Sequence, residues 1–298
     1  MLYYQSKAQK AFSIFNYLFL ICTSVICLAP FVNLLAISFS SSAPVAAGRV
    51  YFWPVDFSLE SYGFAFRGGR FIQGMWVSFR RVLLGVSINL IIMLLTAYPL
   101  ARTKIALTGR NIYMGIFVFI MIFNGGMIPT YLVVVKLGLL NTIWALVLPT
   151  AMSVWNMIIL MNFIRQLPTE LEEAAAIDGA GPFMTLIWII LPLSKPALAT
   201  VGLFCIVWHW NDWFTGIIYM QNVNNYPLQS YLQTLMRNFD QIIRAAGNNQ
   251  DYILLLSMIN ARTGRAAQLF LGALPVFAIY PFLQKYFTTG LVMGSVKG

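Results

Sequence analysis

Acidic residues gather in one short segment of the chain, and their chemistry suits a docking surface for a basic partner. Glu170, Glu172 and Glu173 precede three alanines, and Gly179 closes the segment. Carboxylates in the first turn of a helix are favoured by its dipole and accept charge-assisted hydrogen bonds from arginine or lysine. Alanines form helices readily and add little bulk, so a partner can approach closely. The segment predicts a short acidic helix that is presented to another molecule.

The ends of this segment carry helix start and stop signals. Thr169 is followed three residues later by Glu172, a spacing that predicts a capping box. Gly179 can adopt the left-handed conformation that ends many helices. A solvated surface helix without a partner is the alternative explanation for an acidic, alanine-rich stretch.

A second group with chemical potential lies inside an apolar run. His209 and Asp212 are three residues apart on one helix face, a spacing that would suit a metal or a proton relay. A metal site needs more ligands than this pair, so no metal site is expected. We expect a structural or gating role near the outer membrane face, with three tryptophans as interfacial anchors: Trp208, Trp210 and Trp213.

The elements that position these groups are membrane helices. The chain has 298 residues, 59% hydrophobic and 9% charged, with a mean hydropathy of +0.75. A soluble domain carries roughly 25% charged residues, so lipid is the main solvent here. Runs of roughly 20 apolar residues can cross a bilayer. Six such runs predict an all-α polytopic membrane protein of about six transmembrane helices in one domain, residues 1–298; the runs are 12–37, 77–100, 112–135, 143–164, 186–218 and 267–287.

Charge predicts the orientation of these spans. The short link from Arg102 to Arg110 also contains Lys104 and marks the cytoplasmic side, which places both termini and the loop 165–185 there. Many other arginines then lie outside, mostly in or beside two long extracytoplasmic loops at about 38–76 and 219–266, where the rule is weak. The net charge of +10 comes without a basic cluster, so nucleic-acid binding is not expected.

Each outer loop contains a predicted helix. Residues 58–62 read as the start of a short capped helix, and residues 226–235 carry apolar side chains at helical spacing. The second helix either touches an external partner or lies on the membrane surface, and the sequence leaves both open.

The acidic segment is part of a longer pattern that resembles a known motif. Glu173, two alanines, Gly179, and then Ile189, Leu191 and Pro192 follow the spacing of the EAA motif in binding-protein-dependent ABC importers. In that family this cytoplasmic loop is a coupling helix gripped by the ATPase. The full match argues against the surface helix without a partner. The coupling residues that the resemblance implies are Glu172, Glu173, Ala174, Ala175, Asp178, Gly179, Leu191 and Pro192.

Other segments extend the resemblance from about residue 76 onward. Residues 125–131, 136–142, 208–214 and 290–298 look like the corresponding parts of carbohydrate importers similar to the maltose system's smaller permease. The forms at 208–214 and 226–229 resemble the oligosaccharide and alginate-type branch. The resemblance implies a type I ABC importer permease fold in a bacterial cytoplasmic membrane.

The resemblance also implies partners. They would be a homologous second permease, an ABC ATPase homodimer, an extracytoplasmic solute-binding protein and an oligosaccharide or polysaccharide fragment as substrate. ATP and magnesium would be bound by the ATPase subunits, with no cofactor in this chain. The sequence has no Gly-x4-Gly-Lys-Ser/Thr loop, so we expect a permease subunit that is not itself an enzyme.

Sugars stack on aromatic faces and bind amides or carboxylates through their hydroxyls. The candidates for a substrate pathway are Asn124, Tyr131, Trp155, Asn156, Trp210, Asn211 and Asp212. The alternative is that the aromatics form interfacial belts and the amides join helices. Gly125 and Gly126 likewise suit either a hinge in the third span or close helix packing.

Two other classes of function remain as alternatives. An ion-coupled secondary transporter of small polar solutes usually carries several intramembrane ionisable residues and often inverted repeats. A membrane-embedded enzyme needs a cluster of catalytic residues. The sequence shows neither pattern clearly.

Overall fold

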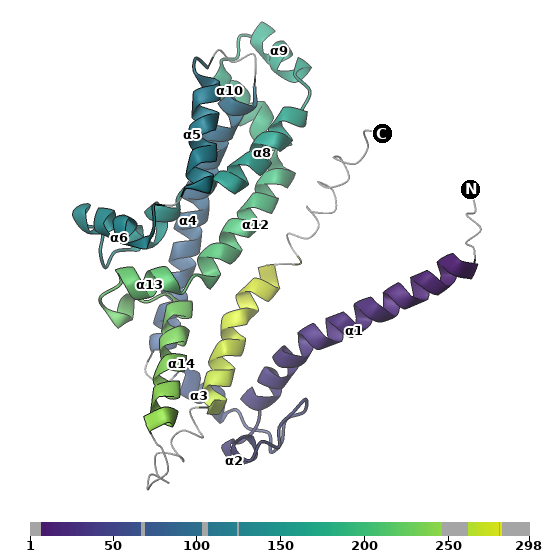
Figure 1. Ribbon diagram of the computed structural model, residues 1–298, viewed down its shortest axis with the longest axis vertical. Coiled ribbons are helices and arrows are strands. Elements are labelled where there is room, and N and C mark those ends of the chain that lie inside the picture. The colour runs from purple at the N-terminus through teal and green to yellow at the C-terminus, as the bar shows by residue number, and fades with distance from the viewer. Residues whose placement is uncertain are drawn as a thin grey trace. The chain divides into compact units, whose positions relative to one another are not determined.

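The computed structural model describes residues 7–66, 69–102, 107–123, 125–245, 262–279 and 281. Every named element in this part is helical, apart from an isolated bridge between Ser40 and Phe57, which confirms the all-α prediction (Figure 1). The chain divides into two compact units, which are described separately. One consists of residues 1–71 and 238–274, and the other of residues 72–237 and 275–298.

The first unit begins with a long apolar helix, α1 (Lys7–Ser38), most of whose side chains are exposed in the isolated chain. Two short helices follow, α2 (Ser42–Ala46) and α3 (Glu60–Phe66). Ser58 Oγ accepts a hydrogen bond of 3.2 Å from the amide of Glu60, which confirms the capped helix predicted here. Residues 262–279 are helical and cover part of the sixth apolar run, and those up to 274 belong to this unit. Residue 280 and those from 282 on lie outside the described residues.

The second unit is organised around α4 (Arg70–Ala101), which extends into it from the first. Buried positions recur every three or four residues along this helix: Gly74, Ser78, Arg81, Gly85, Asn89, Met93 and Ala97. The apolar half of this stripe packs in one core cluster with residues of α8 (Val154–Gln166) and α12 (Lys195–Asn211). The intervening positions are more exposed, as expected for side chains that face lipid.

Three predicted spans are broken helices. By length and composition, two described helices, α1 and α4, can each cross a membrane alone, and up to five spans result if each bent pair counts as one. The bends are 112° between α5 (Arg110–Ile122) and α6 (Met127–Lys136), and 53° between residues 143–150 and α8. The first part of that second pair is α7 (Ile143–Val147) and η1 (Leu148–Thr150).

The third bend, of 79°, separates residues 182–193 from α12. The first part consists of α10 (Pro182–Thr185), a π-helical turn η2 (Leu186–Ile190) and α11 (Leu191–Leu193). Pro196, in the first turn of α12, has no amide hydrogen to donate back across the break. The bend therefore lies where Pro192 and Pro196 interrupt the fifth apolar run.

The break before α6 bears on the two explanations for its glycines. Among the described residues of this chain, a Cβ on Gly125 or Gly126 would meet no atom within 4 Å, so packing against these residues does not account for them. Gly126 has a φ of +90° and stands at the N-cap of α6, a conformation that a side chain would disfavour. These glycines permit the bend.

The outer end of α12 continues into α13 (Phe214–Tyr219), η3 (Val223–Asn225) and α14 (Leu228–Ala245). The start of α14 confirms the helix predicted at 226–235. The Leu228 amide donates to Ser78 Oγ at 2.8 Å, and Ser230 Oγ donates to the Trp213 carbonyl at 2.7 Å. The first turn of α14 is therefore packed on α4 and on the start of α13.

Candidate functional site

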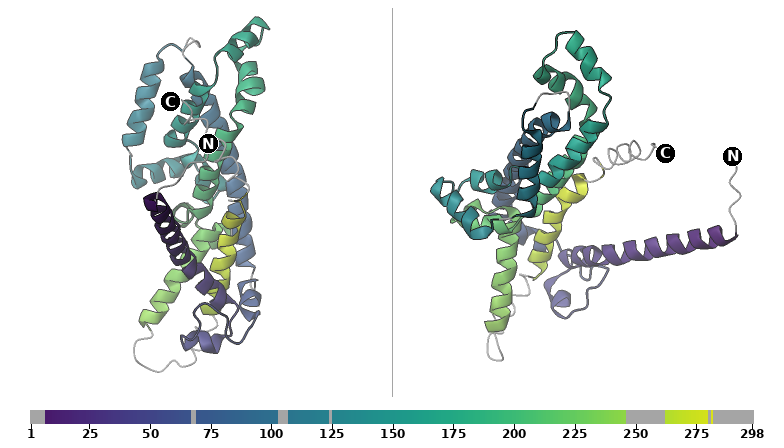
Figure 2. Two further views of the ribbon diagram at one scale, coloured as in Figure 1. Left: turned by 90° about the vertical axis from the view of Figure 1, so that its right-hand side faces the viewer. Right: turned by 45° about the horizontal axis from the view of Figure 1, so that its top comes forward.

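The acidic segment forms a separate two-turn helix, α9 (Glu170–Ile177). It lies with α10 at the end of the second unit where α4 ends and α5 begins (Figures 1 and 2). Glu170, Glu172 and Glu173 occupy its first turn, as predicted. Most of its side chains are exposed, and Ile177 is 87% exposed. An apolar side chain so open to solvent at the tip of an acidic helix is suited to contact with another protein.

The stop of α9 agrees with the prediction in detail. Gly179 has a φ of +81°. Its amide donates to the carbonyl of Ala176 at 3.1 Å, and the Ala180 amide donates to the carbonyl of Ala175 at 2.9 Å. This pair of bonds is a Schellman motif, which needs the left-handed residue between them.

The predicted capping box at the start of α9 is wrong. Thr169 has helical backbone angles, and its side chain makes no cap hydrogen bond. Only its carbonyl takes part, accepting from the amides of Glu172 and Glu173. The carboxylate of Glu172 instead forms an ion pair with Arg102, with 2.5 Å between Oε1 and Nε. A buried guanidinium competes better for this carboxylate than a backbone amide does.

Arg102 ties the end of α4 to the start of α9. Its side chain is only 4% exposed, and Nη1 donates to the carbonyl of Leu167 at 3.2 Å. Arg102, which the sequence analysis used only as a marker of membrane orientation, therefore also makes a contact inside the protein. The pair therefore connects α9 to the residue that directly follows α4.

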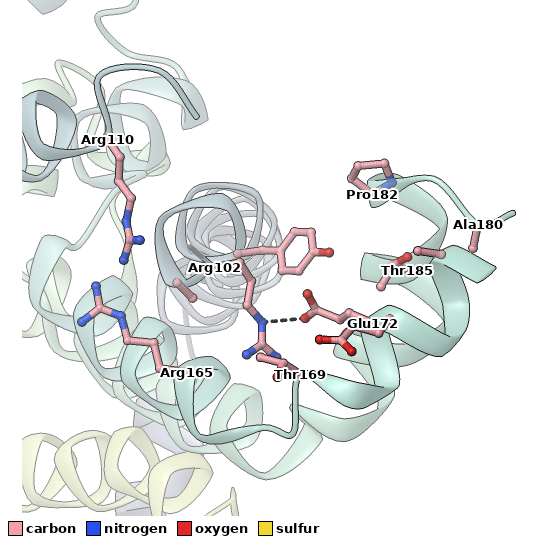
Figure 3. A pocket seen from close by; sticks show the side chains of 12 residues that line it. Arg102, Arg110, Arg165, Thr169, Glu172, Ala180, Pro182 and Thr185 are labelled. Atoms are coloured by element: carbon pink, nitrogen blue, oxygen red, sulfur yellow. Dashed lines mark ion pairs between the residues drawn. The ribbon is translucent and has the colours of Figure 1, made fainter. Parts of the chain in front are cut away.

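A cavity of about 480 Å³ opens between these elements. Figure 3 shows the Arg102–Glu172 pair on one side and the guanidinium groups of Arg110 and Arg165 pointing toward one another on the other. Glu173 and Ala176 also line it. The lining thus carries both signs of charge at the surface beside α9.

The remaining predicted coupling residues are placed as follows. Ala174 and Asp178 are exposed, whereas Ala175 is 7% exposed and packs inward. Leu191 and Pro192 lie in α11, half-buried and exposed respectively, and do not line the cavity beside α9. The structure therefore brings Glu172 and Glu173 to one cavity and leaves the Leu-Pro end of the motif at the bend before α12.

A second polar group lies further along α4. The guanidinium of Arg81 is fully buried and forms an ion pair with Asp212, and its Nη1 donates to the Asp212 backbone carbonyl at 2.9 Å. Asp212 also accepts from Thr215 Oγ1 at 2.5 Å and from the Phe214 amide at 3.0 Å. Burial of this guanidinium is tolerated because Asp212 neutralises its charge.

His209, in α12, packs against Gly85 of α4 and is linked through Asn89 to the break before α8. A Cβ at Gly85 would lie 2.4 Å from His209 Nε2, so only glycine leaves room for the imidazole. Nε2 lies 2.8 Å from Oδ1 of Asn89. The Asn89 amide nitrogen donates to the carbonyls of Thr150 and Ala151, at 2.8 and 2.9 Å, which are exposed by the break before α8. Asn89 thus supplies hydrogen-bond donors to two backbone carbonyls that the break before α8 leaves without helical partners.

Beside this network is a second cavity, of about 450 Å³, between α4, the break before α8, and α12. Its lining includes Asn89, Asn156, Phe204, Cys205, Trp208 and His209. Asn156 Nδ2 lies 3.7 Å from the Cys205 sulfur. The cavity combines aromatic faces with amide and imidazole groups.

Of the predicted pathway residues that the structure describes, Asn156 alone lines this second cavity. Asn124 lies outside the described residues. Tyr131 stacks on Tyr219 with 6.3 Å between ring centroids, in a separate apolar cluster. Trp155 and Asn211 are exposed, Trp210 is 5% exposed and so is no interfacial anchor, and Asp212 pairs with Arg81.

The sequence held a signal for the missed residues. Arg81, Gly85 and Asn89 recur every four positions inside an otherwise apolar run, which places them on one face of one helix. Polar residues at this spacing within a membrane span indicate an interior contact. Their partners, His209 and Asp212, are more than a hundred residues away and only the fold pairs them.

Comparison with known proteins yields consistent similarities. A family model described as the binding-protein-dependent transport system inner membrane component matches residues 64–293. Protein LplC of Bacillus subtilis (strain 168) is 39% identical over 295 residues, 99% of this chain and 98% of that protein. The polygalacturonan/rhamnogalacturonan transport system permease protein YtcP of the same organism is 37% identical over 97% of this chain and 99% of its own length.

A solved structure is also similar. It is that of a bacterial ABC transporter involved in the import of the acidic polysaccharide alginate. The TM-score is 0.84 at 30% sequence identity, and the match covers 95% of this chain and 99% of that chain.

Proposed function

Since this chain belongs to the inner membrane components of binding-protein-dependent transport systems, we propose that it is one permease half of an ATP-driven importer for oligosaccharides or polysaccharide fragments. The full-length relative named for polygalacturonan and rhamnogalacturonan transport supports this class of substrate. So does the similarity to the alginate importer, which also covers nearly the whole chain. Family membership favours the ATP-driven importer over the ion-coupled transporter and the membrane enzyme.

The family implies a binding protein, an ATPase and a partner permease, and ATP hydrolysis is performed by a separate subunit. We further assign the partner permease as a homologous chain and the ATPase as a homodimer. Among the described residues, no three His, Cys, Asp or Glu side chains are grouped so as to hold a metal ion.

The coupling role is assigned to α9. The observation that carries it is the form of this helix: two turns, acidic at the start, exposed along most of its length and closed by a left-handed glycine. The Arg102–Glu172 pair supplies a rigid link from α9 to α4. A force applied to α9 by the ATPase would thus reach a membrane-spanning helix through one buried contact.

The family places the protein in the bacterial inner membrane as a multi-pass component. We assign the end that carries α9 to the cytoplasm, together with both termini. The extracytoplasmic loops at 38–76 and 219–266 would then face the binding protein. The helices α3 and α14 lie in these loops.

The proposal is tested with the complete complex in proteoliposomes. ATP hydrolysis and sugar uptake are measured with the binding protein and a panel of trigalacturonate, alginate oligomers and raffinose. We expect stimulation by at least one oligosaccharide, and uptake that requires both ATP and the binding protein. Uptake driven by an ion gradient without ATP would overturn the proposal.

A charge reversal on α9 tests the coupling role. Glu173→Lys should reduce uptake at least tenfold and lower co-purification of the ATPase, because it places a cation where a basic partner is expected. Glu170→Lys is the matched control, since Glu170 is in the same turn but does not line the cavity. Equal, normal uptake by both variants would remove α9 from the mechanism.

A further inference from the structure

The second cavity lies at a depth where cargo would pass. Asn89 is twelve residues before Ala101 at the end of α4, or about 18 Å along a helix that rises 1.5 Å per residue. The apolar core of a bilayer is about 30 Å thick. The volume of about 450 Å³ lies within the range of small-molecule sites, roughly 300–1,000 Å³. Polar groups at this depth are costly unless they are paired or used.

The hydrogen bonds of Asn89 fix the tautomer of His209. Both amide hydrogens of Asn89 are donated to backbone carbonyls, so its Oδ1 must accept from His209 Nε2. His209 is 1% exposed, and among the described residues its Nδ1 has no hydrogen-bond partner. A second buried charge next to Arg81 would be expensive, so the ring is neutral. Nδ1 is then a buried acceptor without a donor.

The rest of the lining suits a sugar ring. Trp208 and Phe204 are 45% and 43% exposed and present aromatic surface, while Asn156 supplies an amide. Arg81 lies near the Trp208 ring, with 5.7 Å from Cζ to the centroid, but its charge is neutralised by Asp212. None of the described lining residues is charged. A hydroxyl group, which can donate to Nδ1, fits this environment better than a carboxylate does.

We propose that this cavity is a carbohydrate subsite in which Nδ1 of His209 accepts a hydrogen bond from a ring hydroxyl of the transported sugar. The aromatic side chains Trp208 and Phe204 cover the apolar face of that ring, and Asn156 binds a neighbouring hydroxyl. The subsite rests on the proposed transport function and adds this chain's own contact with the cargo to it.

Cys205 provides a direct probe of occupancy. It lines the cavity and is 4% exposed, whereas Cys22 and Cys27 are exposed on α1 and can be replaced by alanine. The experiment measures how fast a small methanethiosulfonate reagent modifies Cys205 in the complete complex with ATP. The rate is compared between sugar-free binding protein and binding protein loaded with trigalacturonate. Binding protein loaded with raffinose tests an uncharged sugar in the same way. We expect the transported sugar to slow modification at least fivefold. Equal rates in a complex that transports the sugar would overturn the subsite but not the transport function.

Two substitutions separate contact with sugar from support of the fold. His209→Gln places an amide nitrogen near the Nε2 position, keeps the donor to Asn89 and removes the acceptor at Nδ1. His209→Asn places an amide near Nδ1 and loses the contact with Asn89. We expect H209Q to assemble normally and to raise the KM for uptake about tenfold, the effect of one lost hydrogen bond. H209N should assemble poorly and keep a KM closer to that of the native protein.

If His209 only supports the fold, H209Q should keep the native KM for uptake, and H209N should be the more impaired variant. If H209Q has the native KM, and sugar gives Cys205 no protection, the cavity is filled by lipid or by the partner permease and the subsite is wrong. If no sugar supports uptake by the native complex, the proposed function itself fails, and this result precedes any comparison of the variants.

Discussion

At the scale of single residues, Gly85 is a position where the second unit leaves no room for a side chain. The imidazole of His209 occupies the space that any side chain at residue 85 would need. That ring is held by Asn89, so it cannot move away without leaving the carbonyls at the break before α8 less well supported. Gly85→Ala should therefore destabilise the folded permease by about 1–3 kcal/mol, the usual cost of overpacking.

The Gly85 prediction is measured by thermal unfolding in detergent. Gly115→Ala is the matched control, because a Cβ there meets no atom within 4 Å and α5 gains helix propensity. Adding His209→Ala to Gly85→Ala should restore part of the lost stability by removing the clash. Equal unfolding temperatures for Gly85→Ala and Gly115→Ala would show that α4 and α12 are not packed as described.

The second residue-scale prediction concerns the Arg102–Glu172 pair. Arg102→Met leaves the carboxylate of Glu172 without its cation at a site where Glu172 is only 16% exposed. We expect a loss of about 1–3 kcal/mol in stability and weaker coupling, because an uncompensated half-buried charge is costly. The exchange R102E/E172R should recover part of both. Arg110→Gln is the control, since no ion pair to Arg110 is present among the described residues.

At the scale of elements, the stop of α9 is the feature that defines it as a short rod. Gly179 has open space around it, so a substitution there is opposed only by its positive φ. Gly179→Val should cost about 1–2 kcal/mol, as β-branched residues avoid this conformation. Gly179→Asn should be tolerated better because asparagine enters the left-handed region more easily. ATP-dependent uptake of the two variants is the measurement, and a valine variant as active as the asparagine variant would contradict this.

The sequence predicted where helices occur far better than where they break. The apolar runs predicted α1 and α4 correctly, because an unbroken helix satisfies its backbone hydrogen bonds internally and needs no distant partner. The break before α8 is different. Its free carbonyls at Thr150 and Ala151 are satisfied by Asn89, some sixty residues earlier in the chain. A local pattern contains no trace of that donor, so the run 143–164 reads as one continuous span.

The same distinction applies to the candidate site. Helix propensity and the glycine stop of α9 are local properties, and both were predictable. The partner of Glu172 is a distant arginine, which is why the capping box expected from local spacing is absent. The aromatic and amide residues singled out as a pathway were chosen by type alone, and type does not say which face of a helix is turned inward. Asn156 lines the cavity, while Trp155 beside it is exposed.

At the scale of the whole molecule, the order of the elements predicts which segments lie on opposite sides of the membrane. Residues 182–211, bent at Ser194, count as one span between α9 and η3. Residue 176 and residue 223 should therefore lie on opposite sides of the membrane. Arg102, Arg110 and Arg165 all line the cavity beside α9. Such a gathering of arginines favours the cytoplasmic side for that end.

This topology is tested by labelling single cysteines introduced at exposed positions. In a background without native cysteines, Ala176→Cys should react with a membrane-impermeant maleimide only in inside-out vesicles, because α9 is expected to face the cytoplasm. Val223→Cys should react only in right-side-out vesicles, since Val223 lies in η3 and is 42% exposed. Reaction of both from the same side would mean that residues 182–211 do not cross the bilayer. Reaction of Ala176→Cys from outside would place α9 beyond the reach of any ATPase, since ATP is hydrolysed in the cytoplasm.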